Sequence, residues 1–232
     1  MVVKQSNHFD RVAKHYDASL PSYVVAHYLE KRLALVQSLV PPPGPVLDVG
    51  CGTGLLAGKL AATGYCVAAL DPSLGMLQEL SSDGAGEPLL GSGTHLPFSD
   101  DAFPAVITVA TLHHIADPRL VAATVEEMVR VTAPGGATVI WDHNPRNPYW
   151  PLLMRRMPQD AEATRLIPLE EILAVLDRTE GCTVRFSRSG WVPDFAPAWS
   201  LPAFTVLEQV LERLPGISSI SAHNVVVVRK GR

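Results

Sequence analysis

The chain has 232 residues, of which 47% are hydrophobic and 18% are charged, and its formal net charge is −4. This composition is that of a globular protein with a substantial core, and the acidic balance argues against general binding to a nucleic-acid backbone. Residues 1–17 are polar, and no apolar run approaches the ~20 residues of a membrane span, so we expect neither a secretory leader nor a membrane anchor. The scattered cysteines, Cys51, Cys66 and Cys182, predict a reduced, cytoplasmic protein without disulfides or structural zinc.

The N-terminal part combines helical and strand patterns. Residues 8–39 carry apolar positions at helical spacing and predict one or two amphipathic helices, which the proline-rich stretch 41–45 ends. An apolar strand is predicted at 46–49 and a helix at 54–63. The strand contains a single charge, Asp48.

Three alternating glycines join this strand to this helix. Gly50, Gly52 and Gly54 remove Cβ atoms where the backbone must turn sharply and approach a ligand closely, which predicts a site for a nucleotide-like ligand. A dinucleotide-binding turn needs G-x-G-x-x-G, but Leu55 occupies the sixth position, and no G-K-[ST] of a P-loop follows. Asp48 is poorly suited to facing a pyrophosphate, and it favours a ligand with a positive charge or an amino group.

Residues 46–54, VLDVGCGTG, resemble motif I of the class I S-adenosylmethionine-dependent methyltransferases, an apolar strand followed by D-x-G-x-G-x-G. A second acidic residue, Asp71, ends the strand predicted at 65–70, close to the offset from the glycines at which an acidic side chain binds ribose hydroxyls. A carboxylate there suits any ribose and does not separate NAD from S-adenosylmethionine. Alternatively, Asp71-Pro72-Ser73 caps the next helix.

The rest of the chain alternates strands and helices. Residues 81–95 are rich in Gly and Ser, and they contain a weakly predicted third strand at 88–92. The alternation predicts a parallel sheet with helices on both faces, and the last two strands, joined by a long connection, predict an antiparallel edge. The remaining predicted elements are strands at 104–110, 137–142, 182–188 and 223–229, helices at 117–131 and 202–214, and a Pro-Gly-Gly turn at 134–136.

Further segments extend the resemblance. Residues 95–118, which contain LPF and LHH, and residues 129–140, which contain PGG, are similar to methyltransferase type 11 and ubiquinone-biosynthesis-like members. The resemblance implies one α/β, Rossmann-like domain over 1–232, with a seven-stranded, mostly parallel sheet, an antiparallel edge strand and helices on both faces. It further implies an N-terminal helical lid at 1–40, to which FDRVAKHYD at 9–17 belongs, a cofactor-binding core at 41–142, and acceptor-side covers at 143–170 and 190–215.

The resemblance implies S-adenosylmethionine as the cofactor and S-adenosylhomocysteine as its product. The implied cofactor-binding residues are Tyr16, Asp48, Gly50, Cys51, Gly52, Asp71, Pro72, Met76, Ser92, Gly93, Thr94 and Ala110. Two positions depart from the family pattern. Ser92 replaces an Asp that accepts from the adenine amino group, and it is a weaker acceptor. Pro104 replaces the Asp that usually follows Phe103, and proline fits only the beginning of a strand.

Methyl transfer mainly requires an acceptor held near the methyl group in a dry pocket, and a neutral histidine suits removal of a hydroxyl proton. Three histidines after predicted strands are catalytic candidates: His113, His114 and His143. His113 and His114 are adjacent, so in an extended chain only one of them faces the pocket, and the resemblance favours His114 as the one that lines the cofactor site. Packing or helix capping is the alternative role. Adjacent histidines lack the i, i+4 spacing of helical metal ligands, so we expect no metal.

The segment 142–156 combines polar, aromatic and arginine side chains with several prolines, which predicts a shaped loop or short helix over the pocket. Its HNPRNP sequence resembles a segment of some bacterial methyltransferases from polysaccharide or natural-product gene clusters. A solvated helix face is the alternative for its arginines. The candidate substrate-binding residues are Asn144, Tyr149, Trp150 and Arg155, and Trp191, Phe195 and Trp199 either wall an acceptor pocket or pack the sheet edge.

The sequence thus predicts methyl transfer from S-adenosylmethionine to a small molecule, with an oxygen acceptor favoured, in bacterial secondary-metabolite or polysaccharide biosynthesis. We expect a monomer or homodimer with no nucleic-acid or membrane partner. Two alternatives remain open. The weakened adenine position favours a non-catalytic module that binds the cofactor, and the ribose carboxylate is shared with NAD-dependent oxidoreductases.

Overall fold

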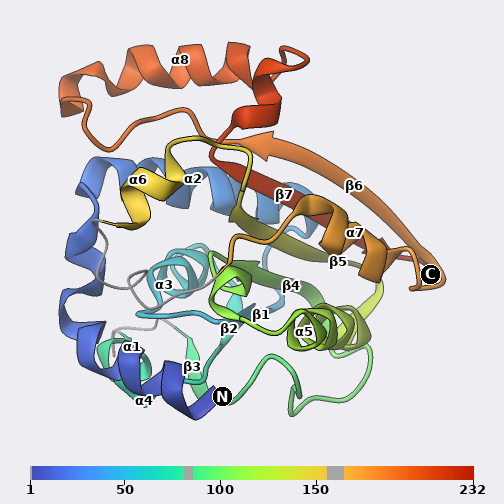
Figure 1. Ribbon diagram of the computed structural model, residues 1–232. Coiled ribbons are helices and arrows are strands. Elements are labelled where there is room, and N and C mark those ends of the chain that lie inside the picture. The colour runs from blue at the N-terminus through green and yellow to red at the C-terminus, as the bar shows by residue number, and fades with distance from the viewer. Residues whose placement is uncertain (1, 81–85, 156–164) are drawn as a thin grey trace.

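The computed structural model describes residues 2–80, 86–155 and 165–232. Its strands are β1 (Pro45–Val49), β2 (Cys66–Asp71), β3 (Glu87–Leu90), β4 (Phe103–Val109), β5 (Thr132–His143), β6 (Cys182–Ser189) and β7 (His223–Lys230). They form one sheet in the order β3-β2-β1-β4-β5-β7-β6 (Figure 1). Strands β3, β2, β1, β4 and β5 pair in parallel, whereas β7 runs antiparallel to both β5 and β6. The predicted Rossmann-like sheet is therefore confirmed; β7 is the strand that runs against the others, and it forms an antiparallel pair with the edge strand β6.

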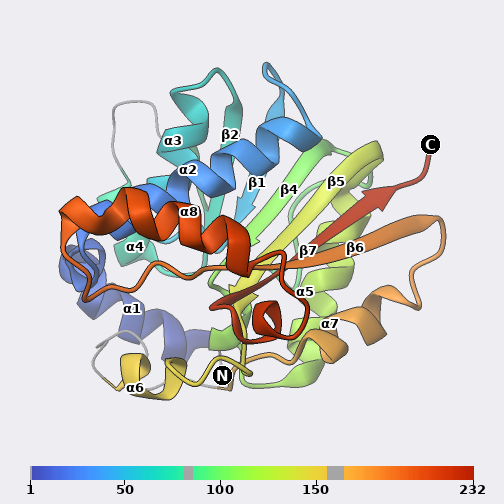
Figure 2. The ribbon, with the colours of Figure 1, turned by 90° about the horizontal axis from the view of Figure 1, so that it is seen from above.

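Helices cover both faces of the sheet. Helices α2 (Ser22–Leu39) and α3 (Leu55–Ala61) pack on one face, and α5 (Pro118–Val131) and α7 (Leu169–Leu176) on the other (Figure 2). Because side chains alternate along a strand, Val46 of β1 enters the core under α2 and α3, while Leu47 and Val49 enter the core under α5 and α7. Burial on both faces explains why this strand is apolar throughout apart from Asp48.

The other helices gather at the edges of this sandwich. They are α1 (Val2–Tyr16), α4 (Leu74–Glu79), α6 (Trp150–Met154) and α8 (Leu201–Leu211), with single 3₁₀ turns η1 (Asp17–Ser19), η2 (Leu112–His114), η4 (Ala198–Ser200) and η5 (Ile217–Ile220). Helix α8 lies on the outer side of α2 in both ribbon views. Within the described part of the chain, no helix is both long and apolar enough to cross a membrane.

The Pro-Gly-Gly segment differs from its prediction as a turn that precedes a strand. It lies inside β5, at an irregularity where the pairing with β4 passes from Phe103↔Thr132 directly to Ala105↔Ala137. Gly135 has a φ of +77°, and a Cβ at Gly136 would lie 2.7 Å from the carbonyl oxygen of Pro104. The backbones of β4 and β5 therefore lie too close together at Gly136 for a side chain to fit between them. Pro104, the second residue of β4, sits at the one place where the ladder is interrupted, as its missing N–H requires.

Candidate active site

The carboxyl ends of β1, β2 and β4 surround a cavity of about 230 Å³. All twelve residues that the sequence indicated as cofactor-binding line it, from Tyr16 at the end of α1 to Ala110 after β4. Ligands of open α/β sheets bind at this edge, outside the carboxyl ends of the strands. We call this space the cofactor cavity.

The glycine turn forms the floor of the cofactor cavity. Gly50 has a φ of +74°, and a Cβ there would lie 2.3 Å from Cγ2 of Thr111. Gly52 has a φ of +57°, and no atom lies within 4 Å of the place where its Cβ would be. Gly50 is therefore required by packing and by its backbone conformation, whereas at Gly52 the missing side chain leaves open space beside the loop.

Asp71 is held against this turn by two backbone amides. Gly52 N–H donates to its Oδ2 at 2.9 Å, and Ser73 N–H donates to its Oδ1 at 2.8 Å. The side chain lies in the cavity wall, and burial raises the pKa of its carboxyl above the ordinary value. Each oxygen retains a lone pair for a ligand hydroxyl. Ser73 also caps α4, because its hydroxyl accepts from Met76 N–H at 3.1 Å, so the capping role and the cavity-lining role are both present.

Asp48 lies deeper, with 2% of its surface exposed. Burial raises the pKa of this carboxyl to about 7, the charge of Asp71 adds to the effect, and Arg32 opposes it. A cation in the cavity would stabilise the ionised form of Asp48. Burial also raises the pKa of the Cys51 thiol, so this cysteine is protonated at neutral pH and lines the wall without acting as a nucleophile.

Hydroxyls line the cofactor cavity at Ser92 and Thr94, where the resemblance led us to expect a carboxylate. Ser92 Oγ and Thr94 Oγ1 are hydrogen-bonded at 2.8 Å, and Thr94 N–H donates to Ser92 Oγ at 3.3 Å. Ile115 and Leu120 add apolar side chains to the cavity wall. Apolar wall together with these hydroxyls suits a flat ring that carries a polar group.

A second cavity of about 410 Å³ adjoins the first, and we call it the acceptor cavity. The two share wall residues, among them Tyr16, Arg32, Ala110 and His114. Its own lining is mainly aromatic and aliphatic, with a group of histidines; the ring-bearing residues are Tyr16, Tyr28, His113, His114, His143, Tyr149, Trp150, Trp191, Phe195 and His223.

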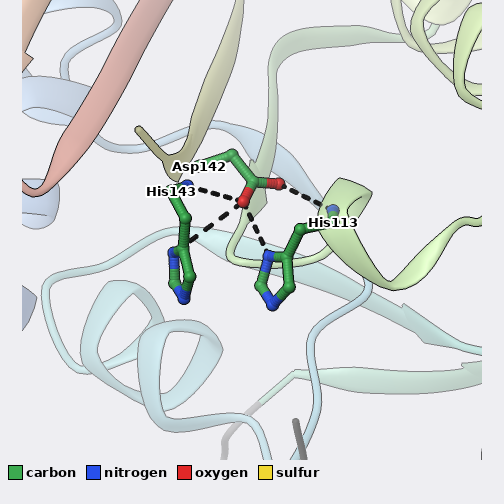
Figure 3. Close-up of side chains that lie close together, drawn as sticks. All are labelled: His113, Asp142 and His143. Carbon is green, nitrogen blue, oxygen red and sulfur yellow. Dashed lines mark hydrogen bonds and ion pairs between the residues drawn. The ribbon is translucent and has the colours of Figure 1, made fainter. Parts of the chain in front are cut away.

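The histidines are organised around Asp142 at the end of β5 (Figure 3). Asp142 Oδ1 accepts from His113 Nδ1 at 2.7 Å, and Oδ2 accepts from Leu112 N–H at 2.8 Å. The His143 ring stacks on that of His113 with centroids 4.1 Å apart, and on that of Trp150 at 3.7 Å. His143 Nδ1 lies 3.8 Å from Asp142 Oδ1, too far for a hydrogen bond.

This environment gives the histidines different electrostatic characters. Burial lowers the pKa of His114 and of His143 well below the ordinary value, and it lowers that of His223 to about 3. Burial alone would raise the pKa of the Asp142 carboxyl, but the charge of His113 and its hydrogen bond leave it below the ordinary value. His113 lines the acceptor cavity, and its ring is hydrogen-bonded to a carboxylate, that of Asp142.

Comparisons with known proteins agree with this geometry. A family model described as "Methyltransferase domain" matches residues 47–140. The chain is 33% identical to a demethylmenaquinone methyltransferase of Mycobacterium sp. (strain KMS), over 79% of this chain and 83% of the relative. It is 35% identical to the enzyme of that name from Clavibacter sepedonicus, over 63% of this chain and 60% of the relative. The chain belongs to the class I S-adenosylmethionine-dependent methyltransferases.

The fold of this methyltransferase is shared by solved structures of low sequence identity. One from Thermotoga maritima, described as an S-adenosylmethionine-dependent methyltransferase and possible histamine N-methyltransferase, superposes with a TM-score of 0.67 at 18% identity. The match covers 97% of this chain and 99% of that chain. As a member of this family, the chain uses S-adenosylmethionine as the methyl donor, and the residues that line the cofactor cavity fit this molecule. Asp71 suits the ribose, Asp48 suits the positive charge, and the apolar wall suits the adenine.

Some placements differ from the sequence-based expectations for this methyltransferase. His113 and His114 lie in the 3₁₀ turn η2 rather than in an extended segment, so both of them line the acceptor cavity, and the expectation that only one would do so is wrong. His114 also lines the cofactor cavity, as expected.

Of the candidate substrate-binding residues, Tyr149 and Trp150 line the acceptor cavity, but Asn144 and Arg155 do not. The Asn144 amide donates to the carbonyls of Ser219 and Ser221, at 2.9 and 2.8 Å, which gives it a structural role. Arg155 is exposed.

The group His113, Asp142 and His143 could in principle hold a metal ion, since one ligand atom of each lies within 4.8 Å of the others. The ring geometry argues against this. The two imidazoles are stacked with their planes 20° from parallel, so their in-plane lone pairs lie in separate, nearly parallel planes and are poorly placed to meet at one ion. The expectation that no metal is bound stays a prediction, now supported by this geometry.

Three residues that shape the site escaped the sequence analysis: two of them line a cavity, and Asp142 lies behind the lining. Arg32 of α2 lines both cavities, Asp142 orients His113, and His223 of β7 joins the histidine group. The helical pattern around Arg32 predicts only a polar residue in a helix, and it contains no signal that this residue reaches a cavity. Asp142 had one available signal, because it ends a predicted buried strand directly before a candidate catalytic histidine.

Proposed function

We propose that this methyltransferase transfers the methyl group of S-adenosylmethionine to a hydroxyl oxygen of a small, flat, largely apolar acceptor. The observation that carries the proposal is the aromatic acceptor cavity, which adjoins the cofactor cavity and has in its wall His113, whose ring is hydrogen-bonded to Asp142 behind it. Pockets of this size and lining suit drug-sized ring compounds.

Bound S-adenosylmethionine supplies an electrophilic methyl group on a positively charged sulfur. The chain's own part is to orient the acceptor and to take its proton. Because Asp142 accepts from Nδ1 of His113, that nitrogen carries the hydrogen and Nε2 is the basic nitrogen of the ring. Nε2 takes the hydroxyl proton as the oxygen attacks, and Asp142 stabilises the resulting imidazolium.

The other candidate histidines shape the pocket in this proposal. His143 is held flat between His113 and Trp150, and its low pKa keeps it neutral against the acceptor. Replacement of His143 by alanine should slow turnover with little change in cofactor affinity, because the base would lose the ring against which it is packed. The predicted lid (1–40) and covers (143–170 and 190–215) then exclude water from the acceptor; residues 156–164 of the first cover lie outside the described residues.

The wider setting follows from the same lining. Flat apolar rings fit an aromatic cavity better than polysaccharide hydroxyls do, so of the two predicted settings we favour secondary metabolism. We expect a cytoplasmic enzyme, monomeric or homodimeric, that binds no nucleic acid. The intact glycine turn and the pre-positioned Asp71 favour an active enzyme over a non-catalytic module. The name of the quinone-methylating relatives favours a second candidate, transfer to a ring carbon beside an ionised hydroxyl.

The decisive experiment is a methyl-transfer assay with a panel of phenols and quinols, in which the rate is measured as the release of S-adenosylhomocysteine. Asp142→Asn and His113→Gln should lower kcat/KM about 100-fold or more at pH 7, since general-base catalysis contributes about 10²–10⁴. Calorimetric affinity for S-adenosylhomocysteine should change less than threefold. His95→Gln, at an exposed position outside both cavities, is the matched control. Unchanged turnover in Asp142→Asn would remove the base assignment, and a C-methylated product, identified by NMR, would replace the oxygen acceptor with the ring-carbon candidate.

A further inference from the structure

Arg32 lies on α2 at the border of the two cavities and lines both of them. Its guanidinium carbon lies 5.6 Å from the centroid of the Trp141 ring and 6.0 Å from that of the Tyr28 ring. Its Nε atom is buried and has no hydrogen-bond partner among the residues that the structure describes. Within the three described ranges of the chain, Arg32 forms no ion pair with a carboxylate.

The acids that line the cavities or lie close to Arg32 are engaged elsewhere. Asp142 accepts from His113 and from backbone amides, Asp17 Oδ1 accepts from Thr53 Oγ1 at 2.7 Å, and Asp194 accepts from the Tyr149 hydroxyl. Asp48 has a pKa of about 7, so it is only partly ionised at neutral pH. Burial lowers the pKa of Arg32 only to about 10, and the group stays a cation. Asp48 and Asp142 act on this cation only from a distance. A cation in a largely apolar site with no carboxylate in direct contact is costly, so the site favours a ligand that brings a negative charge.

The charge of the acceptor cavity limits what this ligand is. Arg32 is the one lysine or arginine among its described lining residues, and burial keeps His114, His143 and His223 neutral. A single guanidinium matches the charge and the planar, two-oxygen geometry of one carboxylate, whereas a phosphate dianion calls for more positive charge. Tyr28 and Trp141, against which the guanidinium lies, restrict its movement.

We propose that Arg32 binds a carboxylate of the acceptor, so that the molecule methylated here is an aromatic acid rather than a neutral phenol. The inference rests on the proposed function, because it takes the second cavity as the place of the acceptor. Since Arg32 also lines the cofactor cavity, the other possible source of a carboxylate is the amino-acid part of the cofactor. The two sources predict different losses when the guanidinium is removed.

The test uses two probes of one shape, 2-naphthoate and 2-naphthamide, titrated by calorimetry into the full-length protein saturated with S-adenosylhomocysteine. The wild type should bind the acid at least tenfold more tightly than the amide. Arg32→Gln should bring the two affinities within about twofold of each other, while its affinity for S-adenosylhomocysteine changes less than threefold. Arg32→Lys, which keeps the charge but not the fork of donors, should retain part of the preference. Arg178→Gln, at an exposed position outside both cavities, should behave as the wild type.

Three results would overturn the inference. One is wild-type binding of the acid that is no tighter than that of the amide, undetectable binding included. Another is a preference for the acid that persists in Arg32→Gln. The third is a tenfold loss of S-adenosylhomocysteine affinity in Arg32→Gln with the acid preference intact, which would assign the guanidinium to the cofactor. Failure of the proposed function is separate, because it would show as a wild type that does not bind S-adenosylhomocysteine or transfers no methyl group to any acceptor.

Discussion

Asp71 illustrates how single residues do two things in this site. Its carboxylate fixes the glycine turn through Gly52 N–H and the start of α4 through Ser73 N–H, and it still faces the cofactor cavity. The residues around it extend the same scaffold. Asp10 of α1 accepts from Ser73 Oγ at 2.6 Å and from Gly75 N–H at 2.7 Å, which ties the predicted lid to the cofactor site.

Asp71→Ala should weaken binding of S-adenosylhomocysteine by more than tenfold. The reason is the loss of two hydrogen bonds from ribose hydroxyls to a charged acceptor, each worth about 1.5–3 kcal/mol. A ribose-specific readout comes from calorimetry with adenosine and 2′,3′-dideoxyadenosine. The wild type should prefer adenosine, and Asp71→Ala should not. Asp177→Ala, which removes an exposed carboxylate outside the cavities, serves as control. A preference for adenosine that survives in Asp71→Ala contradicts the ribose role and leaves only the scaffold role.

At the residue scale, what the sequence could predict depended on how local the signal was. The glycines and Asp71 follow their strands at fixed short distances, so their places in the site could be predicted from spacing alone. Arg32 and His223 reach the same site from α2 and from β7, and nothing along the chain links them to it. Asn144 was predicted to bind substrate because of its type and its loop, but the amide is used by backbone carbonyls that only the tertiary fold brings near.

At the scale of whole elements, α8 shows a reversal of the usual amphipathic pattern. Its buried residue is Glu208, 1% exposed, while Val206 and Val210 are 63% and 51% exposed. Glu208 accepts from His27 Nε2 at 2.8 Å and from Trp191 N–H at 2.9 Å, and it pairs with Lys31 Nζ at 2.9 Å. These partners lower the pKa of Glu208 to about 2 against the effect of burial. Ionic contacts therefore hold α8 on α2 and, through Trp191, connect it to the wall of the acceptor cavity, within the segment predicted to be a cover.

Glu208→Gln should destabilise the protein by about 3 kcal/mol, because it breaks a buried ion pair and removes one of the negative charges that balance Lys31. Urea unfolding measures this loss. Since Trp191 lies in the acceptor wall, hydrogen exchange of residues 190–195 should also quicken, while affinity for S-adenosylhomocysteine stays within threefold of the wild type. Gln209→Ala, at the exposed next position, should change neither stability nor exchange. Unaltered exchange at 190–195 in Glu208→Gln would mean that α8 does not hold this cover.

The elements themselves were predictable to the extent that their patterns were local. Strand β7 (HNVVVVR) and helix α5 with its Asp117 cap lie within a residue or two of where the sequence indicated them. The Pro-Gly-Gly segment was predicted as a turn because its residues are turn formers, whereas its flanking residues, Thr132 and Ala137, both pair with β4 and so include it in β5 as an irregularity. No helical pattern assigns α8 to α2, because hydrophobic periodicity would turn its valines inward, and the ion pairs that orient it come from distant parts of the chain.

At the scale of the whole molecule, the carboxyl edge of the sheet buries a group of neutral histidines between the sheet and its covers. His143 and His223 lie on β5 and β7, with ring centroids 5.6 Å apart, and Tyr28 of α2 contacts His223 at 5.2 Å. Residues of α2, α6, β5 and β7 therefore pack together around the acceptor cavity. Protonation of a histidine here would place a charge among apolar side chains, so the stability of the fold depends on these rings remaining neutral.

This dependence predicts acid sensitivity with a definite sign. The pKa of His223 is about 3 in the folded protein and about 6.5 in an unfolded chain, so below pH 6.5 the unfolded state binds a proton that the folded state does not. Stability is therefore fully present above pH 6.5 and falls as the pH drops toward 3. Between pH 7.5 and 5.5 this residue alone should remove about 1 kcal/mol from the free energy of unfolding.

The variant His223→Phe keeps the ring contacts but cannot take up the proton. Its free energy of unfolding, measured in urea, should therefore fall by about 1 kcal/mol less over that pH interval than that of the wild type. His95→Phe, at an exposed position, should keep the wild-type difference. An equal loss in His223→Phe and the wild type would show that proton uptake by this histidine does not govern acid unfolding.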